Sequence, residues 1–120
     1  MLDSSDDVMY AAKADGEIIG IANVSRLKRR MSHRASIGIS VRQCAWHSGV
    51  GTALMEALLA FARKNGIEQL ELEVRSDNGR AIRLYERFGF RRIGTIPAFL
   101  KVNGEVFASD YMVLPLKNNA

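Results

Sequence analysis

Two segments of this 120-residue chain carry residues suited to binding anions or transferring protons. In the first, 41–54, Gly49 and Gly51 lie where a strand-like stretch gives way to a helix-like one. The first-turn amides of a helix have no intrahelical partner and the helix dipole favours negative charge, so this junction is suited to a phosphate group. A Gly-x-Gly pair alone is equally compatible with an ordinary tight turn.

Two well-known phosphate loops are excluded by inspection. A P-loop needs a lysine followed by serine or threonine, and no such pair follows Gly51. A dinucleotide-binding fingerprint needs a third glycine where Leu54 stands. The phosphate hypothesis therefore depends on the second segment.

That second segment, 78–90, brings Asn78 and Tyr85 together with Gly89 and Phe90. The phenol of Tyr85, with a pKa of about 10 in model compounds, stays protonated at neutral pH and can donate a proton to a leaving group. Tyr85 can also simply pack on an apolar helix face, and Asn78 can simply cap the helix. Phe88 and Phe90 are interpreted as core residues.

The spacing of apolar residues and turns predicts the elements that position these segments. Strands at 8–14 and 17–25 flank Asp15-Gly16, a strong hairpin signal, and a third alternating strand covers 35–41. A helical period over 50–64 ends at Asn65-Gly66. The remaining elements are a strand at 70–74, a helix from the Ser76-Asp77-Asn78 cap to about Phe88, extended stretches at 90–96 and 98–102, a turn at Asn103-Gly104, and a strand at 106–116.

The predicted order is β-β-β-α-β-α-β-β, a mixed sheet with two crossover helices of the α/β (α+β) class. A chain of this length and composition, 48% hydrophobic and 25% charged, is expected to form a single domain over 1–120.

Together the two segments resemble the GNAT N-acetyltransferase family. Its cofactor loop reads Arg or Gln-x-x-Gly-x-Gly or Ala, and its following motif reads Asn-x-x-Ala-x-x-x-Tyr-x-x-x-Gly-Phe. The second motif is complete here at Asn78, Ala81, Tyr85, Gly89 and Phe90. Gly49 and Gly51 match the first, while Trp46 stands where the family most often has Arg or Gln. The resemblance covers 10–116 and implies an acyl-CoA N-acyltransferase-like fold.

The resemblance implies acetyl-CoA as co-substrate, an amine as acceptor, and no metal. The loop amides of 46–52 are expected to hold the pyrophosphate of coenzyme A, the strand ending at Val41 to pair with its pantetheine arm, and Tyr85 to act as the catalytic proton donor. The expected cofactor-binding residues are Ser40, Val41, Arg42, Trp46, His47, Ser48, Gly49, Val50, Gly51, Thr52, Asn78 and Tyr85.

The general base stays open at this point. Glu71 and Glu73 lie on the strand after the first helix, where family members often place a carboxylate, and His33 is a third candidate. Each of the three is also interpretable as a solvent-facing residue. Cys44 is interpreted as a small packing residue, because nothing near it marks an activating base.

The net charge of +4 leaves several partners open. The basic stretch of Arg26, Lys28, Arg29, Arg30 and Arg34 could bind nucleic acid, but it has little aromatic interleaving and a solvated turn is the favoured interpretation. Arg80, Arg83 and Arg87 share a helical face, where they could meet the 3′-phosphate of coenzyme A, with a surface role as the default.

Composition also bears on the compartment. The apolar stretches are far shorter than the roughly 20 residues of a membrane span, and the acidic N-terminus lacks a signal region. One cysteine and two histidines cannot form a disulfide or a zinc cluster. These observations predict a soluble, cytoplasmic protein.

Family members usually begin with a strand and one or two helices that form much of the acceptor pocket, and this chain starts almost at the hairpin. A truncated reading of a longer gene, a minimal domain with an open acceptor site, or a homodimer that covers apolar sheet and helix surface would each explain this. The leading hypothesis is acetyl transfer to a primary amine of a small molecule or protein. The alternatives are a catalytically impaired CoA-binding or assembly module and a small basic nucleic-acid-binding domain.

Overall fold

The computed structural model describes residues 7–116. Its elements follow the predicted order, and their ends lie close to the predicted ones. They are β1 (Asp7–Ala14), β2 (Glu17–Arg26), β3 (Arg34–Val41), α1 (Val50–Lys64), β4 (Gln69–Arg75), α2 (Gly79–Arg87), β5 (Arg91–Val102) and β6 (Glu105–Pro115), with short 3₁₀ helices at Arg29–Met31 and Gln43–Ala45 that the sequence did not predict.

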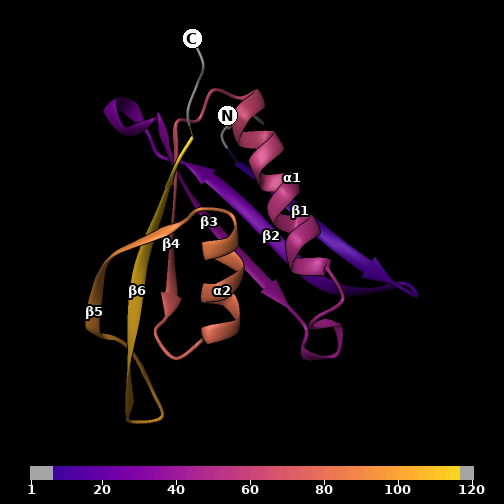
Figure 1. Ribbon diagram of the computed structural model, residues 1–120, viewed down its shortest axis with the longest axis vertical. Helices are drawn as coiled ribbons and strands as arrows, with labels where there is room; N and C mark the ends of the chain where they lie inside the picture. Colours follow the sequence, from indigo (N-terminus) through magenta and orange to yellow (C-terminus); the bar gives the residue numbers. More distant parts are fainter. Residues whose placement is uncertain (1–6, 117–120) are drawn as a thin grey trace.

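The strands form one mixed sheet in the order β1-β2-β3-β4-β6-β5. All neighbours are antiparallel except β3 and β4, which are parallel and pair only over 34–36 and 69–71. Beyond these residues the two strands diverge, as Figure 1 shows below the paired region. The sheet is therefore open in its middle.

Both helices cover the same face of the sheet (Figure 1). Alternate residues of β4, Leu70, Leu72 and Val74, are buried on this face with Met55 and Leu58 of α1. Ala81 and Tyr85 of α2 join the same core. The helical period and the strand alternation in the sequence thus converge on one apolar layer.

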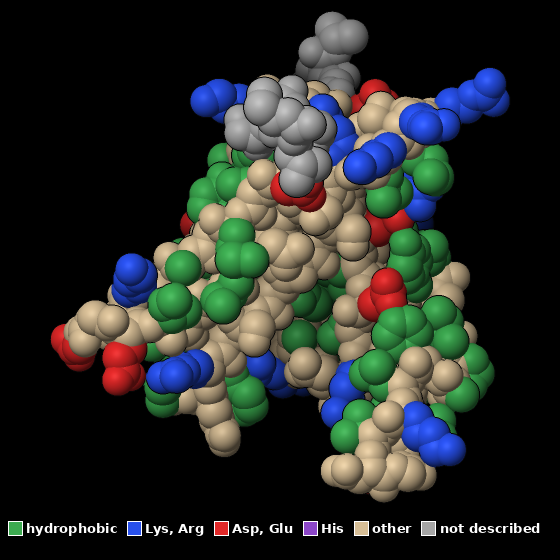
Figure 2. Space-filling view, turned by 180° about the vertical axis from the view of Figure 1, so that it is seen from behind, with side chains coloured by type: hydrophobic (Ala, Val, Ile, Leu, Met, Phe, Trp, Pro, Cys, Tyr) green, Lys and Arg blue, Asp and Glu red, His purple; other side chains and the backbone are tan. Residues whose placement is uncertain are grey.

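The opposite face of the sheet has no helix over it among the described residues, and Figure 2 shows it hollowed between two lobes. Glu71, Glu73 and Arg75 of β4 alternate with the buried apolar residues and so belong to this face. The described part of the chain contains no helix long and apolar enough to cross a membrane.

Exposed large apolar residues gather on the two hairpins. On the β5–β6 hairpin they are Ile93, Ile96, Phe99, Leu100, Val102 and Val106, and on the β1–β2 hairpin Met9, Ile18 and Ile21. Within 7–116 none of these large residues lies on α1 or α2. A homodimer through the sheet stays a prediction. Pro97 lies within β5, an edge strand with a register irregularity between Ile96 and Leu100.

Candidate functional site

The junction between β3 and α1 is held by two glycines with different tasks. Gly49 precedes α1 with φ of 86°, a left-handed conformation that costs glycine little. Gly51 lies in the first turn, and a Cβ there would stand 3.1 Å from Cδ2 of Leu84 on α2. Gly51 thus allows α2 to approach α1 closely. No side chain among the described residues caps this helix end, so its first-turn amides are available to an anion.

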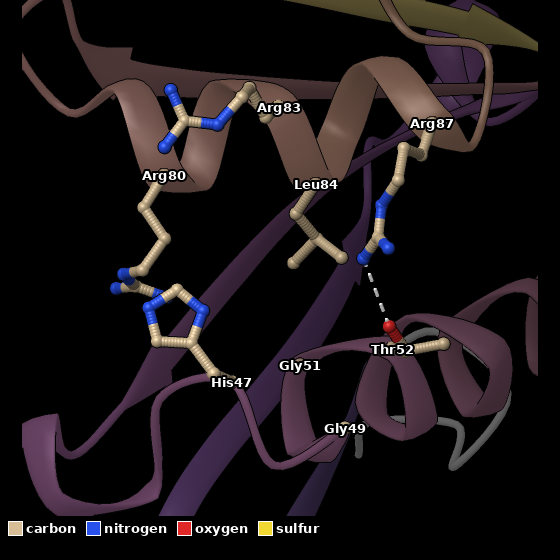
Figure 3. Close-up of a pocket in the computed structure, with 8 residues that line it drawn as sticks. All are labelled: His47, Gly49, Gly51, Thr52, Arg80, Arg83, Leu84 and Arg87. Atoms are coloured by element: carbon tan, nitrogen blue, oxygen red, sulfur yellow. Dashed lines mark hydrogen bonds between the residues drawn. The ribbon is translucent and has the colours of Figure 1, made fainter.

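A cavity of about 450 Å³, the arginine cavity, opens between this helix end and α2 (Figure 3). Its lining residues are His47, Gly49, Gly51, Thr52, Arg80, Arg83, Leu84 and Arg87. Nη2 of Arg87 donates a hydrogen bond to Oγ1 of Thr52 at 3.1 Å, which ties the two helices together. No carboxylate lines the cavity within the described chain. Arg83 and Arg87 are exposed, as the default interpretation of a surface role predicts, but all three arginines line this cavity, so a contact with phosphate stays a prediction.

A second cavity of about 370 Å³, the slot, lies where β3 and β4 diverge. Its lining residues are Ile39, Ser40, Val41, Trp46, Glu73, Val74, Arg75, Asn78, Arg80, Ala81, Leu84 and Tyr85. Arg80 and Leu84 line both cavities. An elongated ligand with an anionic end can therefore occupy the arginine cavity and extend into the slot.

Tyr85 packs in the core and also borders the slot, and its role as proton donor stays a prediction. The residue is 5% exposed, and its ring packs edge-on against Phe90 with the centroids 5.8 Å apart. It also lines the slot. Burial raises the pKa of its phenol, partly offset by the positive charge of Arg80, so the hydroxyl keeps its proton at neutral pH.

Asn78 is an N-cap, as one interpretation of the sequence predicted. Its side-chain oxygen accepts a hydrogen bond from the amide of Ala81 at 3.2 Å. It also lines the slot beside Tyr85. The cap and the site contact coexist because the start of α2 lies at the slot.

The three candidate bases separate clearly in the structure. Glu71 is 2% exposed and paired with Arg34, and it accepts hydrogen bonds from the Tyr111 hydroxyl at 2.7 Å and Gln69 at 3.0 Å. The interpretation of Glu71 as solvent-facing is wrong. These interactions, with Arg34 foremost, lower the pKa of Glu71 to about 2, so it does not accept protons near neutral pH.

Glu73 is exposed and lines the slot with Tyr85. His33 is exposed at the paired end of β3 and β4, where its backbone carbonyl accepts hydrogen bonds from the amides of Glu68 and Gln69. Of the three candidates, only Glu73 belongs to the slot.

Three predicted site residues line neither cavity. Arg42 pairs with Glu17 at 3.4 Å and lines a separate apolar cavity of about 280 Å³ beside the β1–β2 hairpin. The hydroxyl of Ser48 donates to the carbonyl of Ala45, and Val50 packs against the core. Ser40, Val41, Trp46, His47, Gly49, Gly51, Thr52, Asn78 and Tyr85 all line one of the two cavities.

The set of site residues drawn from the sequence omits the α2 arginines. The signal was present, because residues 80, 83 and 87 recur on one helical face. The spacing of these residues does not predict that this face of α2 lies toward the start of α1. Cys44 is exposed, so its interpretation as a packing residue is wrong.

The basic residues from Arg26 to Arg34 do not form a single solvated turn. Lys28, Arg29 and Arg30 are exposed, but Arg34 is ion-paired with Glu71. Arg26 donates through Nη2 to the carbonyl of Asn65. These two arginines therefore serve contacts within the fold. No group of three or more potential metal ligands comes together in residues 7–116.

A model of the acetyltransferase (GNAT) family matches residues 1–90. The N-alpha-acetyltransferase RimI of Mycobacterium tuberculosis is 36% identical over 94 residues, which cover 78% of this chain and 58% of that protein. The chain spans 62% and 45% of two further curated relatives.

Two solved structures show the same architecture. A GNAT-family acetyltransferase from Streptococcus pneumoniae superposes with a TM-score of 0.88 at 26% identity, over 94% of this chain and 69% of that one. A Salmonella typhimurium protein determined with its cofactor acetyl-CoA has a TM-score of 0.83 at 22% identity, over 93% of this chain and 66% of that one. The second likeness bears on the fold alone.

Proposed function

Since this chain belongs to the acetyltransferase (GNAT) family, we propose that it transfers an acetyl group from acetyl-CoA to a primary amine of a small molecule or protein. The observation that carries the proposal is the pair of neighbouring cavities, which share Arg80 and Leu84 in their walls. One is lined by Arg80, Arg83 and Arg87, and the other leads to Tyr85 and Glu73. A polyanionic nucleotide with a long uncharged arm has this distribution of charge.

The residues present fit coenzyme A. Amides of the loop and the first turn of α1, over 46–52, would bind the pyrophosphate, and Arg83 and Arg87 of α2 would meet the 3′-phosphate. Ser48 and Val50 would contribute through their amides rather than their side chains. The unpaired edge of β3 at Ser40 and Val41 would hold the pantetheine arm, since no strand pairs with it there within the described residues. The thioester would then lie near Tyr85.

The reaction needs one proton removed and one supplied. The amine nitrogen attacks the thioester carbonyl, so that a C–N bond forms and the C–S bond breaks. Glu73, exposed in the slot, would accept the proton of the amine, directly or through water. Tyr85, which keeps its proton, would donate to the departing sulfur.

The impaired-module alternative predicts binding of coenzyme A without turnover. Tyr85 and Glu73 both line the slot, so the site favours an active enzyme.

The test is release of free thiol by the purified chain with acetyl-CoA and a panel of amines, including free amino acids and short peptides with free N-termini. Turnover with at least one amine, reduced about 10- to 100-fold in a Tyr85→Phe variant, is the expected result. Calorimetric titration with coenzyme A separates a binding module from an enzyme. Binding without turnover for any amine would favour the module, and no binding would reject both.

A further inference from the structure

Trp46 and Arg80 form a contact at the border between the two cavities. The guanidinium carbon of Arg80 lies 4.0 Å from the centroid of the Trp46 indole, a cation–π stack. Arg80 lines both the arginine cavity and the slot, whereas Arg83 and Arg87 line only the former. A ligand that extends from one cavity into the other passes this pair.

The indole is fixed by the backbone around it. Its Nε1 donates a hydrogen bond to the carbonyl of Val41 at 2.9 Å, at the end of β3. The amide of Trp46 bonds to the carbonyl of Gln43 at 3.1 Å, which closes the 3₁₀ helix before it. The ring is thus held at both its backbone and its tip, and it offers a stable platform despite being 38% exposed.

The stack determines what the guanidinium can still do. A cation–π contact does not use the N–H donors of a guanidinium, so these stay available for hydrogen bonds. The Nε of Arg80 is buried and has no hydrogen-bond partner among the described residues. A buried donor of this kind is costly unless an acceptor reaches it. Arg87, by contrast, already donates to Thr52.

From these contacts we infer that Arg80, positioned by Trp46, is a diphosphate ligand that holds acyl-CoA at the passage between the cavities. The inference rests on the proposed function and adds two residues with distinct tasks. Arg80 binds the ligand, and Trp46 is a positioning residue that acts through Arg80. A planar donor fork suits the oxygens of a diphosphate better than a point charge does.

The test is calorimetric titration of the full chain with coenzyme A, ADP and pantetheine. Arg80→Gln is expected to weaken coenzyme A and ADP binding about 10- to 30-fold and to leave pantetheine within about twofold, because only the first two carry a diphosphate. Arg80→Lys should restore only part of the loss. Arg63→Gln is the matched control, because it removes one positive charge from an exposed position of α1 outside both cavities.

The positioning role of Trp46 requires a double-mutant cycle. Trp46→Leu is expected to weaken coenzyme A binding about 3- to 10-fold in the wild-type background and hardly at all in Arg80→Gln. Trp46→Phe, which keeps an aromatic face, should restore most of the affinity. Thermal unfolding of each variant verifies that the fold persists.

Trp46 also supplies a direct readout, because it is the one tryptophan of the chain. Coenzyme A should change its fluorescence in the wild type, and Arg80→Gln should reduce this change. If the wild type binds coenzyme A and Arg80→Gln binds it with equal affinity, this inference alone is overturned. The same holds if the losses of affinity from Trp46→Leu and Arg80→Gln are additive in the double-mutant cycle. No coenzyme A binding by the wild type would overturn the proposed function and this inference with it.

Discussion

Glu71 and Glu73 lie two residues apart on the same face of β4, yet the first is buried in an ion pair with Arg34 and the second faces the slot. The reason is the divergence of β3 and β4. Glu71 is the last β4 residue that pairs with β3, so Arg34 can reach it, while Glu73 lies beyond the paired region. The same alternating pattern therefore places a structural ion pair at Glu71, where β3 and β4 are paired, and a candidate base at Glu73, where they diverge.

Glu73→Gln is expected to lower kcat about 10- to 100-fold, because the amide cannot accept a proton from the amine. The KM for acetyl-CoA should stay within about twofold, since the α2 arginines and the loop are unchanged. The measurement is thiol release across pH with the best acceptor. Glu68→Gln, an exposed carboxylate just before β4, is the matched control. An unchanged kcat would remove Glu73 from the mechanism.

Glu71→Gln should act on stability instead. The pKa of Glu71 is lowered from 4.5 to about 2, so its carboxylate stabilises the fold above pH 4.5, and this contribution is lost as the pH falls toward 2. We expect the substitution to cost about 2 kcal/mol at pH 7 and less at pH 3. Urea unfolding at both values measures this, and an equal cost at both would contradict the role of the charge.

Tyr111→Phe removes one of the hydrogen bonds to Glu71, the one donated at 2.7 Å. The expected cost is about 1 kcal/mol, smaller than that of Glu71→Gln, because Arg34 still holds the carboxylate. Unfolding at pH 7 tests the order of the two variants. If Tyr111→Phe were the more destabilising, the hydroxyl rather than the ion pair would be the main partner.

Tyr85→Phe keeps the edge-on packing with Phe90 and removes only the hydroxyl. We expect kcat to fall about 10- to 100-fold with little change in the melting temperature. Because burial raises the pKa of Tyr85, the wild-type rate should show no loss from tyrosine deprotonation up to pH of about 10. A pH profile of kcat with melting curves tests both statements. A large drop in stability would show that the hydroxyl is structural.

Gly49→Ala should destabilise the chain by about 1 kcal/mol, because φ of 86° places an L side chain in a strained region although the space around it is open. Gly49→Asn should cost less, since asparagine tolerates this conformation better. Thermal unfolding of the pair separates backbone strain from crowding. Equal costs would argue against a conformational origin.

The order of elements was predictable because local chemistry determines it. Asp15-Gly16 and Asn103-Gly104 both adopt positive φ at two successive residues, as expected of tight hairpin turns. The candidate site was only partly predictable. Alternation along β4 predicts which face Glu71 occupies, but its burial depends on Arg34, 37 residues away along the chain. The contact of Trp46 with Arg80 likewise depends on how α2 packs against the loop before α1.

The divergence of β3 from β4 also gives the sheet an inner edge. Beyond Ser36, β3 pairs within the described chain only with β2, so alternate amides of 37–41 have no strand partner on the β4 side, and residues 39–41 line the slot. These amides should exchange with deuterium quickly in the free protein and slowly once a ligand lies along them. Those of β5, at the outer edge, should exchange at the same rate in both states. Hydrogen exchange can thus map cofactor occupancy residue by residue before any acceptor is known.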